Sequence, residues 1–346
     1  MKRLSKRERF TRCAFGQDID MLPIQCDFSV SGLKRYLSSK GISNVSDLEL
    51  LPFFDNHVLY AYTNGATLRL KTKDTGQDRI LTDEWGVGWD TAQDLCYISN
   101  PLKNWESFAT FSFPDPLSKG VMAYTEMLVN KYADDHIVTG YHFCTLFERA
   151  YMLRGFENAL MDFYLEPDLL CNLLDTITDY QVALAKRYVE TGVNCGRTVD
   201  DYGTQGSMIM SPDTWRVFIK PRLAQIVAVY RNSGLPVIHH SCGAIMPIVG
   251  DLIEIGVNIL NPIQPKAFDL LELSNRYGKL LTFFGGICNQ ELLPFGSPEE
   301  IEKTVMETTS LLGKHGRFVI APSNGIGPDV PLENIEAFRQ AAEACR

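Results

Sequence analysis

The chain has 346 residues, of which 45% are hydrophobic and 22% are charged, and it contains nine cysteines. This composition supports a large folded core and excludes a disordered or collagen-like chain. The formal net charge of −9 provides no basic surface for nucleic acid, which we therefore do not expect as a partner. The odd number of cysteines and the lack of a CxxC pair favour reduced thiols over a disulfide framework.

The N-terminal sequence MKRLSKRERF is basic, but charged residues continue where an export signal requires an apolar segment. The apolar runs of the chain are much shorter than the ~18 residues that cross a membrane. The sequence therefore predicts a cytoplasmic protein without a membrane span.

In chain order, the sequence first predicts a basic helix over 5–15, a strand over 22–29 and a helix over 31–40. Residues 66–100 alternate between polar and apolar types and are rich in aromatic residues and glycine, as in a β-hairpin. We interpret this region as an element inserted at the rim of the fold. Prolines at 114 and 116 precede a predicted helix over 122–132.

Farther along the chain, six apolar runs each precede a helical pattern, and the runs read HIVTGYHF, CGRTVDDYG, LPVIHHSCG, VNILNPIQ, LLTFFGGIC and FVIAPSNG. Strands that alternate with helices predict a parallel sheet covered on both faces. Together with the N-terminal strand, these units approach the eight of a (β/α)8 TIM barrel, and an open doubly wound sheet is the alternative. Polar residues end several of the strands, which favours the barrel because its strand ends converge. We expect one α/β barrel domain over 1–346, with 66–100 inserted.

The strongest candidate for chemistry is the HSC sequence at the end of one apolar run. Because side chains alternate along a strand, His240 and Cys242 point to one face, and His239 points to the other, where we expect a structural role. Imidazole and thiolate suit Zn²⁺, which normally takes at least three protein ligands. Cys288 follows two glycines at another strand end and is the expected third ligand. The alternative is a buried cysteine beside a rim histidine.

Two carboxylates in tandem, Asp200 and Asp201, end another predicted strand. Alternation lets only one of them enter the barrel mouth, where it would serve as general base, substrate clamp or metal ligand. Helix capping is the alternative use. Amides at two further strand ends, Asn261 with Gln264 and also Asn324, either bind polar ligands or satisfy loop backbone.

The segments DDYGTQGSMIMSPDTWR, HHSCG, NILNPIQP and GGICNQELLPFGSPEEI resemble the uroporphyrinogen decarboxylase superfamily, specifically its branch of corrinoid-linked methyltransferases. The resemblance covers about residues 143–342 and extends more weakly to the N-terminus. It implies a (β/α)8 barrel with its site at the C-terminal mouth. The arginine-rich segment by which true decarboxylases of this family grip carboxylates is absent, because the corresponding region reads LPIQCDFSVSGLKRYL.

In the methyltransferase branch, the resemblance implies zinc bound by His240, Cys242 and a distant cysteine in an SPGCG-like turn. Asn324 stands at the position of that distant cysteine. Relatives often carry aspartate where this chain has Cys288. We therefore hypothesise that Cys288 compensates for the lost ligand.

The resemblance thus implies a zinc-dependent methyltransferase that moves a methyl group between a small O-, N- or S-methyl compound and a corrinoid. The corrinoid is expected on a partner protein, because the chain has no DxHxxG-type cobalamin segment. The expected catalytic residues are Asp201, Gln205 and Asn324. The expected contacts to substrate or corrinoid are Tyr202, Asn261 and Gln264.

Two alternatives stay open. A metal-free decarboxylase or lyase would use Asp201 as its acid–base residue and Arg149, Arg154 and Arg197 as candidate carboxylate clamps. A non-catalytic protein would bind a corrinoid or tetrapyrrole without turnover. The sequence leaves the oligomeric state open, with a homodimer among the options.

Overall fold

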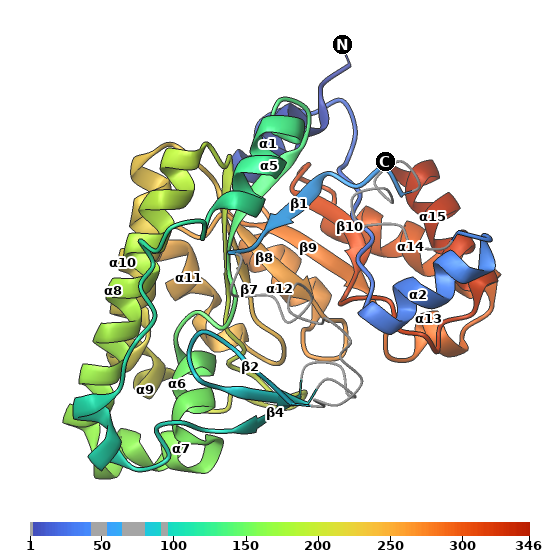
Figure 1. Cartoon of the computed structure of the whole chain (residues 1–346). Coiled ribbons are helices and arrows are strands. Elements are labelled where there is room, and N and C mark those ends of the chain that lie inside the picture. Colours follow the sequence, from blue (N-terminus) through green and yellow to red (C-terminus); the bar gives the residue numbers. More distant parts are fainter. Residues whose placement is uncertain (1–2, 43–53, 64–79, 91–95) are drawn as a thin grey trace.

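A parallel sheet of seven strands forms the centre of the structure, a computed structural model that describes residues 3–42, 54–63, 80–90 and 96–346. The strand order β1-β5-β6-β7-β8-β9-β10 follows the chain, as in a barrel. Figure 1 shows the sheet curled, with α8, α10 and α11 on one side and α14 and α15 on another. The strands are β1 (Val58–Ala61), β5 (Ile137–His142), β6 (Cys195–Val199), β7 (Val237–His240), β8 (Ile259–Ile263), β9 (Thr282–Ile287) and β10 (Phe318–Pro322).

The segment 22–29 lies between β10 and β1. On the β10 side, Gln25 N donates to Ile320 O at 3.0 Å, and Ile320 N donates to Pro23 O at 2.9 Å. On the β1 side, the Gln25 side chain donates to Val58 O at 3.1 Å and accepts from Val58 N at 3.0 Å. A side-chain amide thus replaces the backbone ladder. The predicted strand over 22–29 is therefore an extended segment with isolated bridges rather than a regular strand. As the eighth segment around the centre it confirms the predicted TIM-barrel class.

The barrel centre is apolar and is covered at its N-terminal end. Val58, Ile137, Ile238 and other buried strand residues form one cluster with Phe10 and Ala14 of α1 (Lys6–Phe15). The Phe10 ring meets the Phe284 ring edge to face, with 6.4 Å between centroids. Since α1 fills this end, the space for a ligand lies at the carboxyl ends of the strands.

Helices cover the outside of the sheet, and the predicted helices over 5–15, 31–40 and 122–132 are confirmed as α1, α2 and α5. The start of α14 illustrates how the sequence determines where a helix begins, because Ser297 and Glu300 form a capping box and Pro298 occupies the first turn. In the described part of the chain, no helix is both long and apolar enough to cross a membrane. Besides α1, the helices are α2 (Val30–Ser39), α5 (Ala123–Tyr132), α6 (Phe147–Arg154), α7 (Phe156–Leu165), α8 (Pro167–Thr191), α9 (Pro212–Phe218), α10 (Lys220–Asn232), α11 (Val249–Ile255), α12 (Leu270–Tyr277), α13 (Leu292–Phe295), α14 (Pro298–Leu312) and α15 (Leu332–Cys345).

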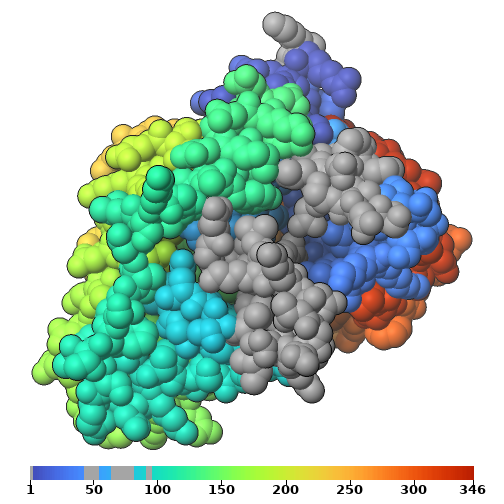
Figure 2. Space-filling model, viewed as in Figure 1, coloured from blue at the N-terminus to red at the C-terminus, as the bar shows by residue number. Residues whose placement is uncertain are grey.

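The N- and C-terminal parts of the chain meet beside the barrel. Figure 2 shows the blue surface of α2 against the red of the C-terminal helices. The Tyr36 hydroxyl donates to Glu336 at 3.1 Å, and Lys40 pairs with the same carboxylate at 3.0 Å. These contacts hold α2, which follows the closing segment 22–29, against α15.

The predicted insertion over 66–100 contains a small antiparallel sheet of β2 (Ile80–Thr82), β3 (Gly88–Asp90) and β4 (Cys96–Ser99). The described part of the insertion thus has three strands rather than the two of a hairpin, and positions 66–79 and 91–95 lie outside the described residues. Asp83 anchors it, because its carboxylate accepts from the Trp89 indole at 3.1 Å and pairs with Arg149 of α6 at 3.0 Å. Trp85 and Trp89 are buried, and their rings contact Tyr180 of α8 and Phe143 at 4.7 and 6.3 Å between centroids, so they pack the inserted element against the barrel.

Candidate active site

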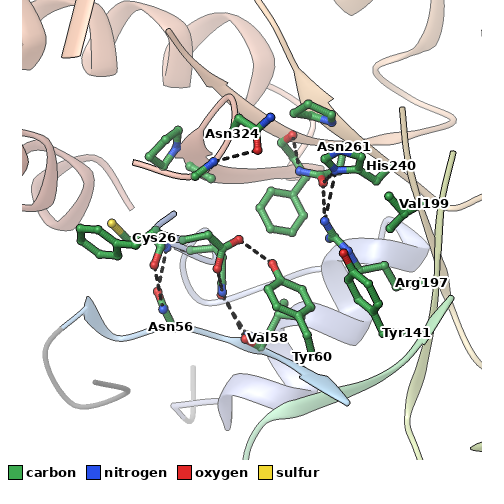
Figure 3. Close-up of a pocket in the computed structure, with 18 of the residues that line it drawn as sticks. Cys26, Asn56, Val58, Tyr60, Tyr141, Arg197, Val199, His240, Asn261 and Asn324 are labelled. Atoms are coloured by element: carbon green, nitrogen blue, oxygen red, sulfur yellow. Dashed lines mark hydrogen bonds between the residues drawn. The ribbon is translucent and has the colours of Figure 1, made fainter. Parts of the chain in front are cut away.

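A cavity of about 610 Å³ opens at the carboxyl ends of the barrel strands. Its walls come from the segment 22–29 and from all seven strands of the sheet, together with residues that follow β6 and β10 and with side chains of α5 and α6. Figure 3 shows polar groups from several of these elements pointing into the same space. The polar strand ends of the sequence are thus brought to one site, as the barrel prediction requires.

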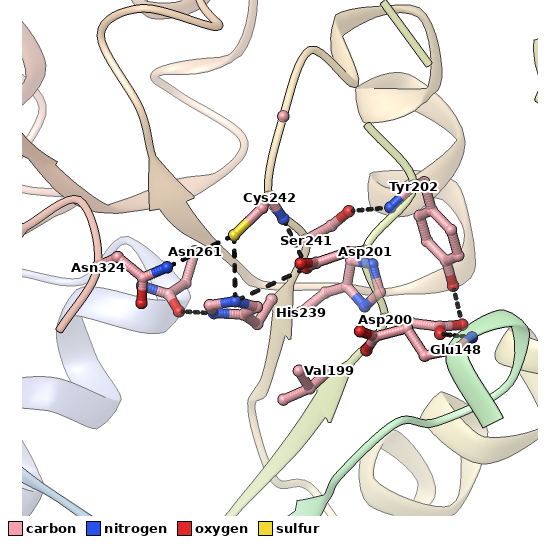
Figure 4. A network of polar contacts seen from close by, with 12 residues as sticks. Glu148, Val199, Asp200, Asp201, Tyr202, His239, Ser241, Cys242, Asn261 and Asn324 are labelled. Carbon is pink, nitrogen blue, oxygen red and sulfur yellow. Dashed lines mark hydrogen bonds and ion pairs between the residues drawn. The ribbon is translucent and has the colours of Figure 1, made fainter. Parts of the chain in front are cut away.

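Three candidate metal-binding side chains gather at this mouth. The ligand atoms of Asp201, His240 and Cys242 all lie within 4.8 Å of one another. Cys242 Sγ is 3.6 Å from His240 Nε2, and Asp201 Oδ1 is 3.8 Å from the same nitrogen (Figure 4). His240 and Cys242 share one face, as predicted from strand alternation. The third member, Asp201, follows the neighbouring strand β6, whose Val199 pairs with His240.

A hydrogen bond to Asn261 orients the His240 ring. The Asn261 Nδ2 amide donates to Phe284 O at 3.3 Å, which turns Asn261 Oδ1 toward His240 Nδ1 at 2.7 Å. That oxygen can only accept, whereas Arg197 Nη2, 3.2 Å from the same nitrogen, can only donate. The shorter contact, to Asn261, favours the tautomer with the proton on Nδ1, in which the Nε2 lone pair faces Cys242 and Asp201. A metal-binding histidine is commonly oriented by such a bond at its other ring nitrogen.

Asp200 and Asp201 point to opposite sides. The buried Asp200 carboxylate accepts from the backbone N–H groups of residues 146–148 at the start of α6, at 2.7 to 3.2 Å. It also accepts from the Tyr202 hydroxyl at 2.8 Å, and burial raises its pKa to about 7. Asp201 lines the cavity and accepts from Cys242 N at 2.8 Å. Only one of the two carboxylates enters the mouth, as predicted.

The electrostatics of the cluster favour a bound cation. Burial and the adjacent Asp201 carboxylate raise the pKa of the Cys242 thiol. Burial lowers the pKa of His240, against the opposing effect of Asp201, so the imidazole is neutral. A divalent cation among these groups would stabilise the thiolate and the carboxylate together.

Of four other predicted site residues, two line the cavity and two lie outside its lining. Asn324 lines the cavity, and its Nδ2 donates to Cys242 Sγ at 3.7 Å. Asn261 lines the cavity as the partner of His240. Gln264 Oε1 accepts from Gly243 N at 2.7 Å, so it holds the loop after β7. Gln205 is exposed and bonds to Gln290 at 3.3 Å, outside the cavity lining.

Two predicted site residues are placed elsewhere. Tyr202 is fully buried, its hydroxyl is used by Asp200, and its ring stacks on His239 with 5.5 Å between centroids. It does not line the cavity, and the expected substrate contact stays a prediction. Cys288 follows β9 and is not a member of the cluster that Asp201, His240 and Cys242 form. His239 bonds to Thr198 at 2.8 Å on the far face, in the structural role expected.

Of the three arginines predicted as candidate carboxylate clamps, one lines the cavity and two form ion pairs elsewhere. Arg149 pairs with Asp83 at 3.0 Å, and Arg154 pairs with Asp162 at 2.8 Å, both away from the cavity. Arg197 lines the cavity and donates to Asn261 Oδ1 at 2.9 Å. The predicted clamp set is thus reduced to one residue, because the others are occupied in structural ion pairs.

Glu148 is a cavity residue that the sequence did not reveal. It is buried, and burial together with Asp201 and Asp200 raises its pKa well above the ordinary value. Its Oε1 accepts from the Tyr151 hydroxyl at 3.3 Å, while Oε2 has no hydrogen-bond partner among the described residues. Its place in the FERAYMLR helix gave no signal, because only the turn of α6 toward Asp201 brings it to the mouth.

A parallel barrel with an Asp-His-Cys cluster at its mouth defines a protein of the α/β-barrel class with its site at the strand ends. The family model described as uroporphyrinogen decarboxylase (URO-D) matches residues 83–345. The chain therefore belongs to the uroporphyrinogen decarboxylase family, which confirms the resemblance inferred from its motifs.

Comparison with individual proteins gives two kinds of relatives. The methylcobamide:CoM methyltransferase MtaA of Methanosarcina barkeri is 31% identical over 176 residues, which are 51% of this chain and 49% of that protein. The chloroplastic uroporphyrinogen decarboxylase 2 of rice, Oryza sativa subsp. japonica, is 28% identical over 187 residues, 52% of this chain and 44% of that protein. The matches thus span about half the length of these curated relatives.

A solved structure supports the fold over the whole chain. The methyltransferase from Methanosarcina mazei superposes with a TM-score of 0.74 at 19% identity and covers 99% of both chains. At this identity the likeness establishes the barrel fold.

Proposed function

We propose that this chain is a zinc-dependent methyltransferase that moves a methyl group between a small methylated compound and a corrinoid carried by a partner protein. The observation that supports this most is the convergence of Asp201, His240 and Cys242 within 4.8 Å at the barrel mouth. The relative from Methanosarcina barkeri, named a methylcobamide:CoM methyltransferase, supports the reaction class.

The residues present fit zinc. The cluster offers one nitrogen, one sulfur and one carboxylate oxygen, and three protein ligands with an open position are typical of catalytic zinc. His240 presents its Nε2 lone pair because Asn261 holds Nδ1. In this proposal Asp201, rather than Cys288, is the third ligand.

When bound, zinc would supply Lewis-acid polarisation of a substrate heteroatom or stabilise a substrate thiolate. The chain's own residues would orient and protect the reacting group. Asn324 reaches the Cys242 sulfur from across the mouth, so it would restrain the thiolate. Glu148 places a carboxyl group with a raised pKa in the same cavity, where it can hold a proton.

A direct assay tests the proposal. Under anaerobic conditions, zinc-loaded protein is mixed with methylcobalamin and a small thiol, and demethylation of the corrinoid is followed by its absorbance. We expect demethylation that depends on zinc, that is lost in C242S and that is retained in C288S. Corrinoid demethylation at the rate of a protein-free control, with or without zinc, would overturn the proposal.

A metal-free decarboxylase is the second candidate, since Arg197 lines the cavity and the rice relative is named a decarboxylase. It requires release of CO₂ from a carboxylated substrate by zinc-free protein. Loss of that release in an Asp201→Asn variant, with C242S fully active, would favour this second candidate.

A further inference from the structure

Asn324 stands on the turn after β10, and this turn is held from both sides. On one side it bonds to the segment after β9, where Asn289 Nδ2 donates to Gly325 O at 3.3 Å and the Ser323 hydroxyl donates to Asn289 Oδ1 at 2.9 Å. On the other side it packs against the segment 22–29, whose backbone leaves little room for a Cβ at Gly325. Contacts on both sides therefore fix where Asn324 stands.

The orientation of the Asn324 amide follows from its backbone neighbour. Gly325 N donates to Asn324 Oδ1 at 2.8 Å, so this oxygen is already in use. The other end of the amide, Nδ2, faces Cys242 and donates to its sulfur at 3.7 Å (Figure 4). An amide nitrogen only donates, so it cannot bind a cation. Asn324 thus offers the cluster a hydrogen-bond donor and no ligand atom.

His240 presents a different group to the same sulfur. Its Nε2 lies 3.6 Å from Cys242 Sγ and carries a lone pair in the tautomer that Asn261 favours. That lone pair is the ligand atom His240 would offer to a cation. Among the described residues, the side-chain N–H donor left to the Cys242 sulfur is then Asn324.

An N–H donor at this place has two consequences for a bound metal. A hydrogen bond to a metal-bound thiolate draws charge from the sulfur, so the metal stays a stronger Lewis acid. The cluster also keeps three protein ligands and the open position of a catalytic site. A cysteine at position 324 would supply a fourth protein ligand and fill that position, as in structural zinc sites.

We propose that Asn324 is a positioning residue that donates an N–H···S hydrogen bond to Cys242 and thereby keeps a cation bound at the cluster electron-poor and open to a substrate heteroatom. The proposal deepens the proposed function and rests on it for the bound cation. The hydrogen bond itself is testable on metal-free protein, so the two can fail separately.

Cobalt substitution tests the effect on the metal, since Co²⁺ gives a sulfur-to-metal charge-transfer band. Metal-free protein is titrated with Co²⁺ under anaerobic conditions. In N324A the band should move to longer wavelength, because a sulfur without its hydrogen bond gives up an electron to the metal more easily. The affinity for Co²⁺ should fall about 10-fold. A band at the wild-type wavelength in N324A would overturn the proposal.

The matched control is Q290A. Gln290 is an exposed amide, like Asn324, but it bonds to Gln205 at 3.3 Å and is not part of the cluster. Q290A should keep the wild-type band and the wild-type affinity for Co²⁺. A band shift in Q290A equal to that in N324A would show that any amide lost from the rim has this effect, and would overturn the proposal.

The N324C variant tests the open position. Its added thiolate should bind Co²⁺ more tightly than wild-type protein does and should leave no position for an external ligand. Mercaptoethanol should therefore change the Co²⁺ spectrum of wild-type protein and leave that of N324C unchanged. An N324C spectrum that responds to mercaptoethanol as the wild-type spectrum does would overturn the open position.

A metal-free measurement separates this proposal from the metal assignment. In a proton–nitrogen correlation spectrum of protein with isotope-labelled asparagine, N324A identifies the side-chain amide signals of Asn324. Cys242→Ala should shift the signal of the hydrogen-bonded proton upfield, and Q290A should leave it in place. Wild-type protein that takes up no Co²⁺ would contradict the proposed function. An Asn324 amide signal that is the same in Cys242→Ala and wild type would overturn the hydrogen bond.

Discussion

Asp200 and Asp201 are adjacent in the chain, yet their carboxylates serve opposite sides of the barrel wall. Asp200 accepts from three backbone N–H groups at the start of α6 and from the Tyr202 hydroxyl. Asp201 faces the cavity, 3.8 Å from His240 Nε2. One carboxylate therefore holds the fold and the other is available for chemistry.

This division predicts opposite effects of two isosteric substitutions. Asp201→Asn should lose most of the bound zinc, because an amide is a poor zinc ligand, while the urea unfolding midpoint of the zinc-free protein stays near wild type. Asp200→Asn should keep zinc but lower stability by about 2 kcal/mol, because an amide offers one oxygen to four donors. Zinc content and urea unfolding measure the two effects. Equal zinc loss in both variants would contradict the division.

Cys288 should be dispensable for metal binding. Its thiol is not part of the cluster at the mouth, and β8 separates β9 from β7 in the sheet. A Cys288→Ser variant should therefore retain the full zinc content of the wild-type protein. Metal analysis after dialysis decides the point, and a zinc content comparable to that of a Cys242→Ser variant would restore Cys288 as a ligand.

The barrel should depend on the side chain of Gln25. This amide supplies hydrogen bonds to Val58 O, Val58 N and His57 N, at 3.0 to 3.1 Å, where the backbone ladder is interrupted. Gln25→Ala should lower the free energy of unfolding by about 2 kcal/mol or more, since buried backbone groups lose their partners. The exposed Gln225→Ala serves as control in urea unfolding. A Gln25→Ala midpoint equal to that of the control would show that the closing segment is held by other contacts.

Buried histidines should make the protein less stable as the pH is lowered. Burial lowers the pKa of His142, which bonds to Gln181 and Tyr230, to about 4. An unfolded histidine titrates near ~6.5, so between about pH 6.5 and about pH 4 the unfolded chain binds the extra proton and stability is lost as pH falls. His142→Gln should remove up to about 1.4 kcal/mol per pH unit of that slope.

The informative quantity is the difference between His142→Gln and wild type in urea unfolding across this window. The raised pKa of Asp200 acts in the opposite direction, so the absolute slope combines both effects. Replacement of the exposed His315 by Gln should leave the slope unchanged. Parallel pH profiles for His142→Gln and wild type would contradict the role of His142.

The fold and part of the site were predictable because they follow from local periodicity. Alternation along a strand placed His240 and Cys242 together and separated Asp200 from Asp201. The third ligand depends on which strands are neighbours, and only the pairing of Val199 with His240 brings Asp201 to Cys242. The same reason explains Glu148, which reaches the cavity because Asp200, after β6, holds the start of α6.

The account rests on zinc held by Asp201, His240 and Cys242, and the zinc content of purified wild-type protein and of Cys242→Ser tests it most directly. Elemental analysis after dialysis against metal-free buffer should give about one zinc per wild-type chain and a small fraction of that in the variant, because two remaining ligands rarely hold this metal. Wild-type protein that cannot retain zinc after reconstitution, or a Cys242→Ser variant that keeps the full amount, would contradict the account.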